Sequence, residues 1–343
     1  MSIIMKTNAT DDDVKAVVKM LEGFGLRADI SKGEYHTVIG EIGDEKKMDA
    51  ELIKTLQGVK DVIPIQVPYR LMSRSYIDND ITVKVGNTKI GGKEPPVYIA
   101  GPCSIESYEQ LSRIGIKVKE AGANMLRGGA FKPRTSVHSF QGLGTEGLKH
   151  LRRVGEELDM PTVTEVRSEL DVEIVAEYAD MLQIGARNMY NQDLIEAVAK
   201  QNKPVLFKRG FSAQIDEYLS FGERLIAHGN RNVVLCERGI TPLGGAFKQQ
   251  TRYTLDIAAV PVINSETPFP VITDPSHASG RKDLVVPMAR ASIAAGANGL
   301  IIEVHDRPQE ALSDANQALH PDVLKELIKS CNDIYETLNR KIG

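Results

Sequence analysis

The 343-residue sequence contains no tryptophan and only three cysteines, Cys103, Cys236 and Cys331. Because the cysteines are odd in number and lack CxxC spacing, they exclude a disulfide framework and a cysteine-rich zinc site. No apolar run approaches the roughly 18 residues needed to span a bilayer, and the first residues lack the pattern of a secretory signal. These absences predict a cytoplasmic protein with reduced cysteines and no membrane partner.

A strong excess of one charge is also missing. Lys and Arg number 42 against 46 Asp and Glu, so the formal net charge is 42 − 46 = −4. Nucleic acids and anionic membranes require a basic face, so we expect neither as a partner. Hydrophobic residues make up 42% and charged residues 26% of the chain, as in globular proteins with a sizeable core. At about 150 residues per domain, the length predicts two domains.

The first 70 residues predict a small domain with the element order βαββαβ. A helix that starts after Thr10 places Val14, Val17 and Leu21 on one face, and a second helix is expected at 49–56. Strands are expected at 2–6, 27–31, 36–42 and 59–67. This order is that of a ferredoxin-like fold. Because no catalytic cluster is visible in it, we expect a regulatory or structural role for residues 1–70.

Residues 71–343 alternate short apolar runs with amphipathic helices, and a hairpin at 81–92, which precedes them, is expected to join the two domains. The runs are 97–100, 124–126, 162–164, 181–184, 205–207, 233–235, 271–273 and 300–302. Continuous apolar strands between helices indicate a parallel sheet. Eight of them in about 250 residues favour a closed (β/α)8 TIM barrel over an open sheet. The final helix, 323–338, is expected to bury Cys331 in the core.

A charged or metal-capable residue follows each of the eight runs. In such a barrel the active site is built at the carboxyl ends of the strands, so these residues are expected to meet. They are Cys103, Arg127, Glu165, Arg187, Lys208, Glu237 with Arg238, His277 and Glu303, and Lys132 and Arg134 lie in the loop after Arg127. This recurrence predicts an enzyme with a cation-rich active site.

The chemistry of these residues divides them into two sets. One set is cationic and implies substrates with several negative charges: Arg127, Lys132, Arg134, Arg187, Lys208 and Arg238. The other set is Cys103, His277, Glu303 and Asp314, and its mixed donors suit one divalent ion such as Mn²⁺, Fe²⁺ or Zn²⁺ better than Mg²⁺ or Ca²⁺. Taken singly, these four could instead be a packed thiol, a capping histidine, a salt-bridge partner and a helix cap.

At these residues the sequence resembles the 3-deoxy-D-arabino-heptulosonate 7-phosphate (DAHP) synthases. The motifs occur in the family's order from about residue 70 onward, and the first 70 residues resemble the regulatory domain of one bacterial branch. The motifs are Ala100–Ser104, Leu126–Ser136, Ile184–Arg187, Phe207–Gly210, Cys236–Gly239, Asp274–His277, Ile302–His305 and Leu312–Asp314. The resemblance therefore covers essentially the whole chain.

The resemblance implies condensation of phosphoenolpyruvate with D-erythrose 4-phosphate, the first step of the shikimate pathway. It assigns the divalent metal to Cys103, His277, Glu303 and Asp314. It places the phosphoenolpyruvate phosphate on Arg187 and Arg238, the carboxylate near Arg127, Lys132 and Lys208, and the sugar phosphate on Arg134 and Thr135. Cys103, His277 and Lys132 would be catalytic, with Lys132 donating the proton to the new alkoxide. Glu165, or a water on the metal, would guide the attacking water.

The family likeness also implies a homo-oligomer, a tetramer in relatives, and inhibition by tyrosine or phenylalanine bound to residues 1–70. The effector is expected near Ser31, Lys32 and Gly33; the alternative is a module for oligomerisation or stability. One departure from the family lies after Arg238, where Thr241 and the stretch 242–246 replace an arginine and a shorter run.

Three other functions compete with this interpretation. 3-Deoxy-D-manno-octulosonate 8-phosphate synthases share the barrel and most motifs but use arabinose 5-phosphate, and they carry Lys-Ala-Asn-Arg where this chain has Lys132, Pro133 and Arg134. A Schiff-base aldolase would use Lys208 as its nucleophile. A non-catalytic sensor of phosphorylated metabolites would be expected to have lost a ligand or Lys132, and neither is lost here.

Overall fold

A computed structural model describes residues 2–33, 37–42, 50–63, 67–132, 140–242 and 250–339. The chain separates into two units, Met1–Pro68 and Tyr69–Gly343, each of which is described by itself. The structure places the division after Pro68, whereas the sequence analysis placed it after residue 70. Tyr69 belongs to the second unit because it is fully buried there and its hydroxyl donates to the Glu266 carboxylate at 3.0 Å.

The first unit is a four-stranded antiparallel sheet with two helices. Its strands are β1 (Ser2–Met5), β2 (Arg27–Lys32), β3 (Thr37–Ile42) and β4 (Val59–Ile63), in the spatial order β2-β3-β1-β4. The helices are α1 (Asp11–Gly23) and α2 (Ala50–Lys54). Thr10 and Asp13 form a capping box that starts α1. Val17 and Leu21 of α1 pack with Ile3, Ile39 and Ile53 in one core. The predicted βαββαβ order is therefore confirmed.

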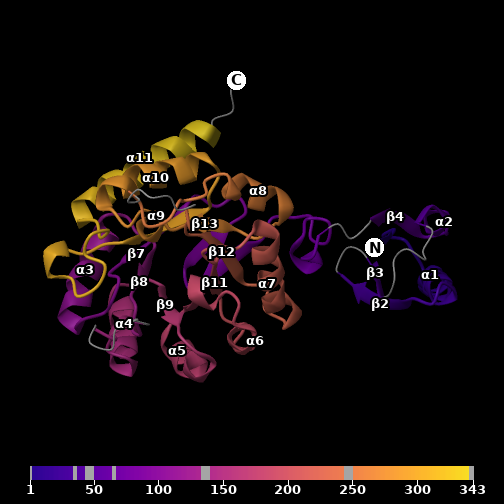
Figure 1. Ribbon diagram of the computed structural model, residues 1–343, viewed down its shortest axis with the longest axis horizontal. Coiled ribbons are helices and arrows are strands. Elements are labelled where there is room, and N and C mark those ends of the chain that lie inside the picture. The colour runs from indigo at the N-terminus through magenta and orange to yellow at the C-terminus, as the bar shows by residue number, and fades with distance from the viewer. Residues whose placement is uncertain are drawn as a thin grey trace. The chain divides into compact units, whose positions relative to one another are not determined.

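The second unit is built on a closed barrel of eight parallel strands (Figure 1). The strands are β7 (Val97–Gly101), β8 (Met125–Arg127), β9 (Thr162–Val166), β10 (Met181–Ile184), β11 (Val205–Lys208), β12 (Val233–Glu237), β13 (Val271–Thr273) and β14 (Gly299–Glu303). Strand β14 pairs with β7 and closes the ring. Each predicted apolar run is one of these strands, because a strand covered on both faces is apolar throughout.

Helices surround the ring of strands in Figure 1. They are α3 (Tyr108–Glu120), α4 (Thr145–Glu157), α5 (Val172–Tyr178), α6 (Gln192–Ala199), α7 (Ile215–Ala227), α8 (Ala259–Glu266), α9 (Pro275–Ser279), α10 (Lys282–Ala294) and α11 (Pro321–Asn339). Short 3₁₀ turns occur at η2 (Arg70–Met72), η3 (Glu169–Asp171), η4 (Ala186–Asn188) and η5 (Pro308–Glu310). Cys331 is fully buried on α11, as predicted.

A hairpin of β5 (Thr82–Val85) and β6 (Thr88–Gly91) closes the amino-terminal end of the barrel. Its Val83, Val85 and Ile90 are buried in one cluster with barrel residues such as Ile99 and Met125. Because apolar side chains fill the amino-terminal end, the accessible end of the barrel is the one formed by the carboxyl ends of the strands. None of the helices in the described ranges is both long and apolar enough to cross a membrane.

Candidate active site and metal centre

Four metal-capable side chains from distant parts of the chain meet at the carboxyl end of the barrel. Cys103 lies two residues after β7, His277 is on α9, Glu303 ends β14 and Asp314 follows in the next loop. One potential ligand atom from each lies within 4.8 Å of those of the other three. Cys103 and Glu303 are buried, while His277 and Asp314 are partly exposed. The structure thus brings together all four residues that the sequence predicted as ligands.

The contacts within this group are those of a site that can hold a cation. Glu303 Oε1 lies 3.1 Å from Arg127 Nη1 and 3.2 Å from His277 Nε2, yet it is buried with no hydrogen-bond partner among the described residues. The thiol of Cys103 lies 3.1 Å from Asp314 Oδ2. A sulfur, an imidazole and two carboxylates are a donor set for borderline divalent ions. These residues therefore fit a divalent metal.

The protonation of the group depends on burial and on its neighbours. Burial, together with the charge of Glu303, raises the pKa of the Cys103 thiol to about 12, although Lys132 and Arg127 act in the opposite direction. Burial would also raise the pKa of Asp314. The thiol hydrogen bond and the positive charges of His277 and Arg252 outweigh it, so the pKa of that carboxyl is lowered. Metal binding to such a thiol releases its proton.

Asp274 orients His277 and was not singled out from the sequence. It is fully buried, and its Oδ2 accepts from His277 Nδ1 at 2.7 Å and from Lys208 Nζ at 2.5 Å. Its Oδ1 caps α9 by accepting from the His277 backbone N–H at 2.9 Å. These bonds fix the imidazole so that Nε2 faces Glu303. The Asp-Pro sequence at a helix start is the signal that could have identified it.

Gln317 and Arg252 support the two carboxylates from outside. Gln317 Nε2 donates to Glu303 Oε2 at 2.6 Å, and Arg252 Nη2 pairs with Asp314 Oδ1 at 3.1 Å. Arg252 Nη1 also donates to Gln317 Oε1 at 3.2 Å. Neither residue follows an apolar run, so no pattern in the sequence assigned them to the site.

The predicted cationic residues occupy different environments. Arg127, Lys208 and Arg238 are buried, Lys132 is partly exposed with Nζ 3.1 Å from Cys103 Sγ, and Arg187 is exposed. Arg134 and Thr135 lie outside the described residues. Glu303 pairs with Arg127 and Asp274 with Lys208.

Arg238 differs from these two because no carboxylate in the described part of the chain forms an ion pair with it, and its Nη1 is also buried without a hydrogen-bond partner there. A buried donor without a partner is costly, so an anion is the natural acceptor at this position.

Two acidic residues at strand ends have separate surroundings. Glu165 Oε2 accepts from Gln183 Nε2 at 3.1 Å, and a Cβ on Gly185 would collide with Glu165 Oε1. Glu237 is fully buried at the end of β12, directly before Arg238, and pairs with Arg209 Nη1 at 2.9 Å. Gly239 N–H also donates to Glu237 at 2.7 Å.

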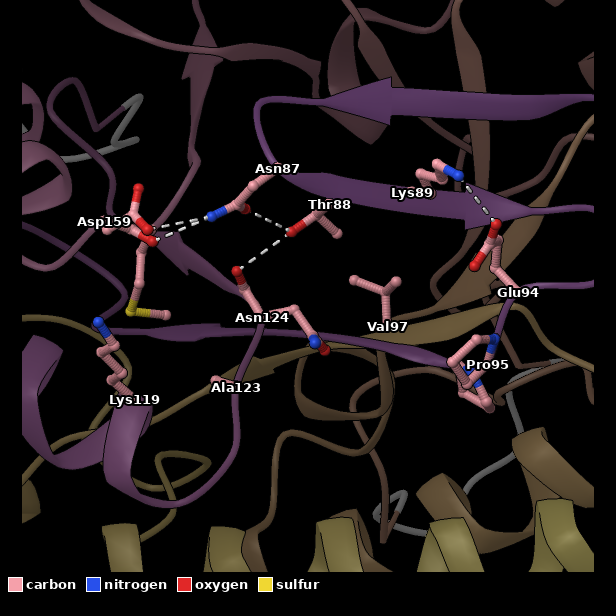
Figure 2. A pocket seen from close by; sticks show the side chains of 12 residues that line it. Asn87, Thr88, Lys89, Glu94, Pro95, Val97, Lys119, Ala123, Asn124 and Asp159 are labelled. Atoms are coloured by element: carbon pink, nitrogen blue, oxygen red, sulfur yellow. Dashed lines mark hydrogen bonds and ion pairs between the residues drawn. The ribbon is translucent and has the colours of Figure 1, made fainter.

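A pocket of about 340 Å³ lies at the opposite end of the barrel (Figure 2). The hairpin and the segments that precede β7, β8 and β9 line it. Asn87 Nδ2 donates to the Asp159 carbonyl at 3.4 Å, and Thr88 Oγ1 donates to the Asn124 carbonyl at 3.4 Å. The polar side chains of Asn87 and Thr88 therefore already have hydrogen-bond partners within the pocket lining. The pocket is separate from the metal-capable group, which lies at the other end of the barrel.

Comparison with known families accounts for both units. A family model described as the DAHP synthetase I family matches residues 76–340. A second model, described as the DAHP synthase ferredoxin-like domain, matches residues 1–67.

Individual relatives agree with these matches. The phospho-2-dehydro-3-deoxyheptonate aldolase of Thermotoga maritima is 44% identical over 343 residues, which is 100% of either chain. Its crystal structure superposes with a TM-score of 0.78 over 98% of this chain and 97% of that one. The 2-dehydro-3-deoxyphosphooctonate aldolase of Geotalea daltonii is more distant, at 33% identity over 271 residues, covering 74% of this chain and 97% of the relative.

Proposed function

The chain belongs to the DAHP synthetase I family, and from this membership we infer that the residues at the carboxyl end of its barrel perform the DAHP synthase reaction. That reaction condenses phosphoenolpyruvate with D-erythrose 4-phosphate and water to give DAHP and phosphate, at the start of aromatic amino acid biosynthesis, and it depends on a divalent metal. The observation that carries the assignment of residues is the meeting of Cys103, His277, Glu303 and Asp314 within 4.8 Å, beside buried cations.

Cys103, His277, Glu303 and Asp314 would hold the divalent ion. When bound, the ion supplies Lewis-acid polarisation of the sugar aldehyde. Asp274 keeps the imidazole of His277 turned toward Glu303 through the bond at Nδ1, and Gln317 fixes the Glu303 carboxylate. The ligands are therefore already oriented, which reduces the cost of assembling the site.

The cations bind and orient phosphoenolpyruvate. Arg127 and Lys208 are buried at the ends of β8 and β11, where with Lys132 they would hold the carboxylate. Arg238, with its unpartnered Nη1, and Arg187 would hold the phosphate. Two polyanionic substrates repel each other, and a preorganised cationic site offsets that repulsion while it fixes their approach.

Lys132 is the proposed proton donor in the carbon–carbon bond-forming step. C3 of phosphoenolpyruvate attacks the aldehyde carbon, and the aldehyde oxygen takes a proton from Lys132 Nζ as it becomes an alcohol. Arg134 and Thr135 would hold the phosphate of D-erythrose 4-phosphate from the same loop. The partly exposed Lys132 supports this role because its Nζ lies 3.1 Å from Cys103 Sγ, beside the proposed metal ligands.

In the second half of the reaction, water adds at C2, which the attack by C3 has left electron-deficient, and phosphate leaves as the C2–O bond breaks. One proton of the water leaves with the phosphate and the other restores Lys132, so the water oxygen becomes the C2 carbonyl of DAHP. Glu165 is the proposed residue that orients this water. Glu165 is the penultimate residue of β9, and its carboxylate accepts a hydrogen bond from Gln183 on the neighbouring strand β10. That position, next to the segment that leads to Arg187, supports the role.

The choice of aldose tests the proposed function. With saturating phosphoenolpyruvate and a divalent ion, we expect kcat/KM for D-erythrose 4-phosphate to exceed that for D-arabinose 5-phosphate by about 100-fold, the scale on which an active site discriminates one extra carbon unit. The measurement is phosphate release with each aldose. Preference for the pentose would assign the chain to the octulosonate synthases instead, the alternative function. A substrate adduct that becomes fixed on Lys208 after reduction with borohydride would indicate a Schiff-base mechanism.

The remaining proposals concern regulation and assembly. The first unit matches the family's ferredoxin-like domain, and we propose that tyrosine or phenylalanine binds to it, near Ser31, Lys32 and Gly33, and inhibits the activity of the barrel.

We also propose that the protein is a cytoplasmic homotetramer. Light scattering should then give about four times the 37.6 kDa chain mass, and a monomer in solution would contradict this assembly.

A further inference from the structure

Two aromatic side chains that the reaction does not use contact Arg238. Phe211 lies three residues after β11, and Tyr253 lies in the segment between β12 and α8. Their rings stack in parallel, with centroids 5.0 Å apart and an interplanar angle of 10°. The Arg238 Cζ lies 4.7 Å from the Phe211 centroid and 4.4 Å from the Tyr253 centroid. The guanidinium therefore touches both rings of one pair.

Backbone hydrogen bonds join the two segments that carry these rings to each other and to α9, at the carboxyl end of the barrel. Thr241 N–H donates to the Phe211 carbonyl at 2.6 Å. Tyr253 N–H donates at 2.7 Å to the carbonyl of Ala278, the residue after His277. Ile240 and Thr254 exchange two bonds of 2.9 Å. The ring pair is thus part of the framework that also carries Arg238 and His277.

The electrostatics of Arg238 explain why aromatic rings suit this position. Arg238 is only 6% exposed, and within the described ranges no carboxylate forms an ion pair with it. A carboxylate partner would neutralise the guanidinium and compete with an incoming anion. Aromatic faces stabilise a buried cation through their quadrupole and leave its N–H groups available. Arg187 Cζ also lies over Phe211, 5.8 Å from the centroid.

We propose that Phe211 and Tyr253 are positioning residues that hold the Arg238 guanidinium ready for the phosphate of phosphoenolpyruvate. This inference rests on the proposed role of Arg238 in binding that phosphate. It adds that the two rings stabilise the charge of the buried guanidinium in place of a carboxylate, and that they leave its N–H groups free to donate to the phosphate.

The test measures steady-state constants for both substrates in Phe211→Leu and Tyr253→Leu. We expect the KM for phosphoenolpyruvate to rise about tenfold in each, the effect of losing a desolvated cation–π contact, with the KM for D-erythrose 4-phosphate changed less than twofold. The conservative variants Phe211→Tyr and Tyr253→Phe keep the ring face and should restore the phosphoenolpyruvate KM to within about twofold of wild type.

Phe221→Leu is the matched control. Phe221, on α7, packs against Tyr190 at a centroid distance of 5.1 Å and lies under Arg224 at 5.9 Å, so it loses the same kind of contact outside the site. It should leave both KM values unchanged. A phosphoenolpyruvate KM that rises equally in Phe221→Leu would overturn the inference.

A double-mutant cycle separates positioning from a general structural role. Arg238→Ala alone should raise the phosphoenolpyruvate KM, and adding Tyr253→Leu to it should produce no further rise, because the cation over the Tyr253 ring is Arg238. If Arg238→Ala raises this KM but the leucine variants do not, or if Tyr253→Leu raises it equally in both backgrounds, the inference fails while the role of Arg238 stands. An unchanged KM in Arg238→Ala would overturn that role and the inference with it.

Discussion

At the scale of single residues, charge pairing determines which side chains can share the buried end of the barrel. Glu303 and Asp274 are both fully buried, where an isolated carboxylate would be too costly to stay ionised. Burial would raise the pKa of each, but His277 and Lys208 lower the pKa of Asp274 and His277 and Arg127 lower that of Glu303. Both carboxylates therefore remain charged and available as acceptors.

Replacement of Cys103 tests the metal centre directly. We expect Cys103→Ala to purify with little divalent metal and to lose turnover, because the only sulfur among the four donors is removed. Metal per chain, measured by elemental analysis after gel filtration, reports the first effect. Cys331→Ala is the control, since that thiol is buried on α11 away from the site and its loss should leave metal content unchanged.

Two outcomes would contradict this prediction. One is Cys103→Ala with wild-type metal content, and the other is full activity of the wild-type protein after exhaustive chelation.

The role of Asp274 predicts a different pattern. Asp274→Asn leaves Lys208 without its buried counter-charge and His277 without its orienting carboxylate. We expect metal affinity to fall by about 10–100-fold and the free energy of unfolding to fall by about 3–5 kcal/mol. Metal titration and chemical denaturation measure the two effects.

Asp180→Asn provides the comparison for Asp274. Asp180 accepts hydrogen bonds from Thr162 N and Oγ1 at 2.8 and 2.9 Å, at the amino-terminal end of β9. It should lose about 1–3 kcal/mol of stability with unchanged metal affinity. If both variants lowered metal affinity equally, the positioning role of Asp274 would be wrong.

At the scale of elements, the β5–β6 hairpin acts as the floor of the barrel. Its alternating residues place Val83, Val85 and Ile90 among the barrel side chains, while Lys84 between them is exposed. The sequence predicted the hairpin from this alternation but interpreted it as a connection between the two domains. The structure shows that it completes the core of the second unit.

Truncation of Ile90 tests that packing. Ile90→Ala should lower the free energy of unfolding by about 2–5 kcal/mol, because it leaves a cavity in a fully buried cluster. Lys84→Ala on the same hairpin should stay within about 0.5 kcal/mol of wild type. Chemical denaturation followed by circular dichroism measures both. Equal stability of the two variants would mean that the hairpin is not part of the cooperative core.

At the scale of the whole molecule, the two units each have a hydrophobic core of their own. The core of the first unit gathers residues such as Ile3, Leu21 and Ile39, and the metal-capable group lies wholly within the second unit. A chain that begins at Tyr69 therefore retains every residue assigned to the chemistry. This separation is the arrangement expected when regulation and catalysis occupy different domains.

Removal of residues 1–68 tests the regulatory role. We expect the remaining chain to keep turnover within about threefold of the full chain and to lose inhibition by tyrosine or phenylalanine, since a ligand can act only through a site that is present. Activity assays with each amino acid titrated into both proteins measure this. A full-length protein with a flat response to tyrosine, phenylalanine and tryptophan would favour a structural role for the first unit.

The sequence alone determined the features that depend on local periodicity. Continuous apolar runs gave the eight strands, and the residue after each run identified Cys103, Arg127 and Glu303 as side chains at one end of the barrel. Such patterns are readable because strand burial and strand direction act on every residue of the segment. The resemblance to the family could also be recognised from the sequence alone, because it depends on motifs that occur in a fixed order along the chain.

Only the tertiary structure decided which of these atoms meet. Cys103 and Asp314 are 211 positions apart, and ring closure between β7 and β14 brings them to 3.1 Å. Asp274 caps the start of α9 and the Phe211–Tyr253 pair lies in loops. No periodic pattern fixes the direction of these side chains, so their contacts with His277 and Arg238 were not predicted. Side-chain partners in a packed interior are set by three-dimensional closure, because the neighbours come from segments that share no local pattern.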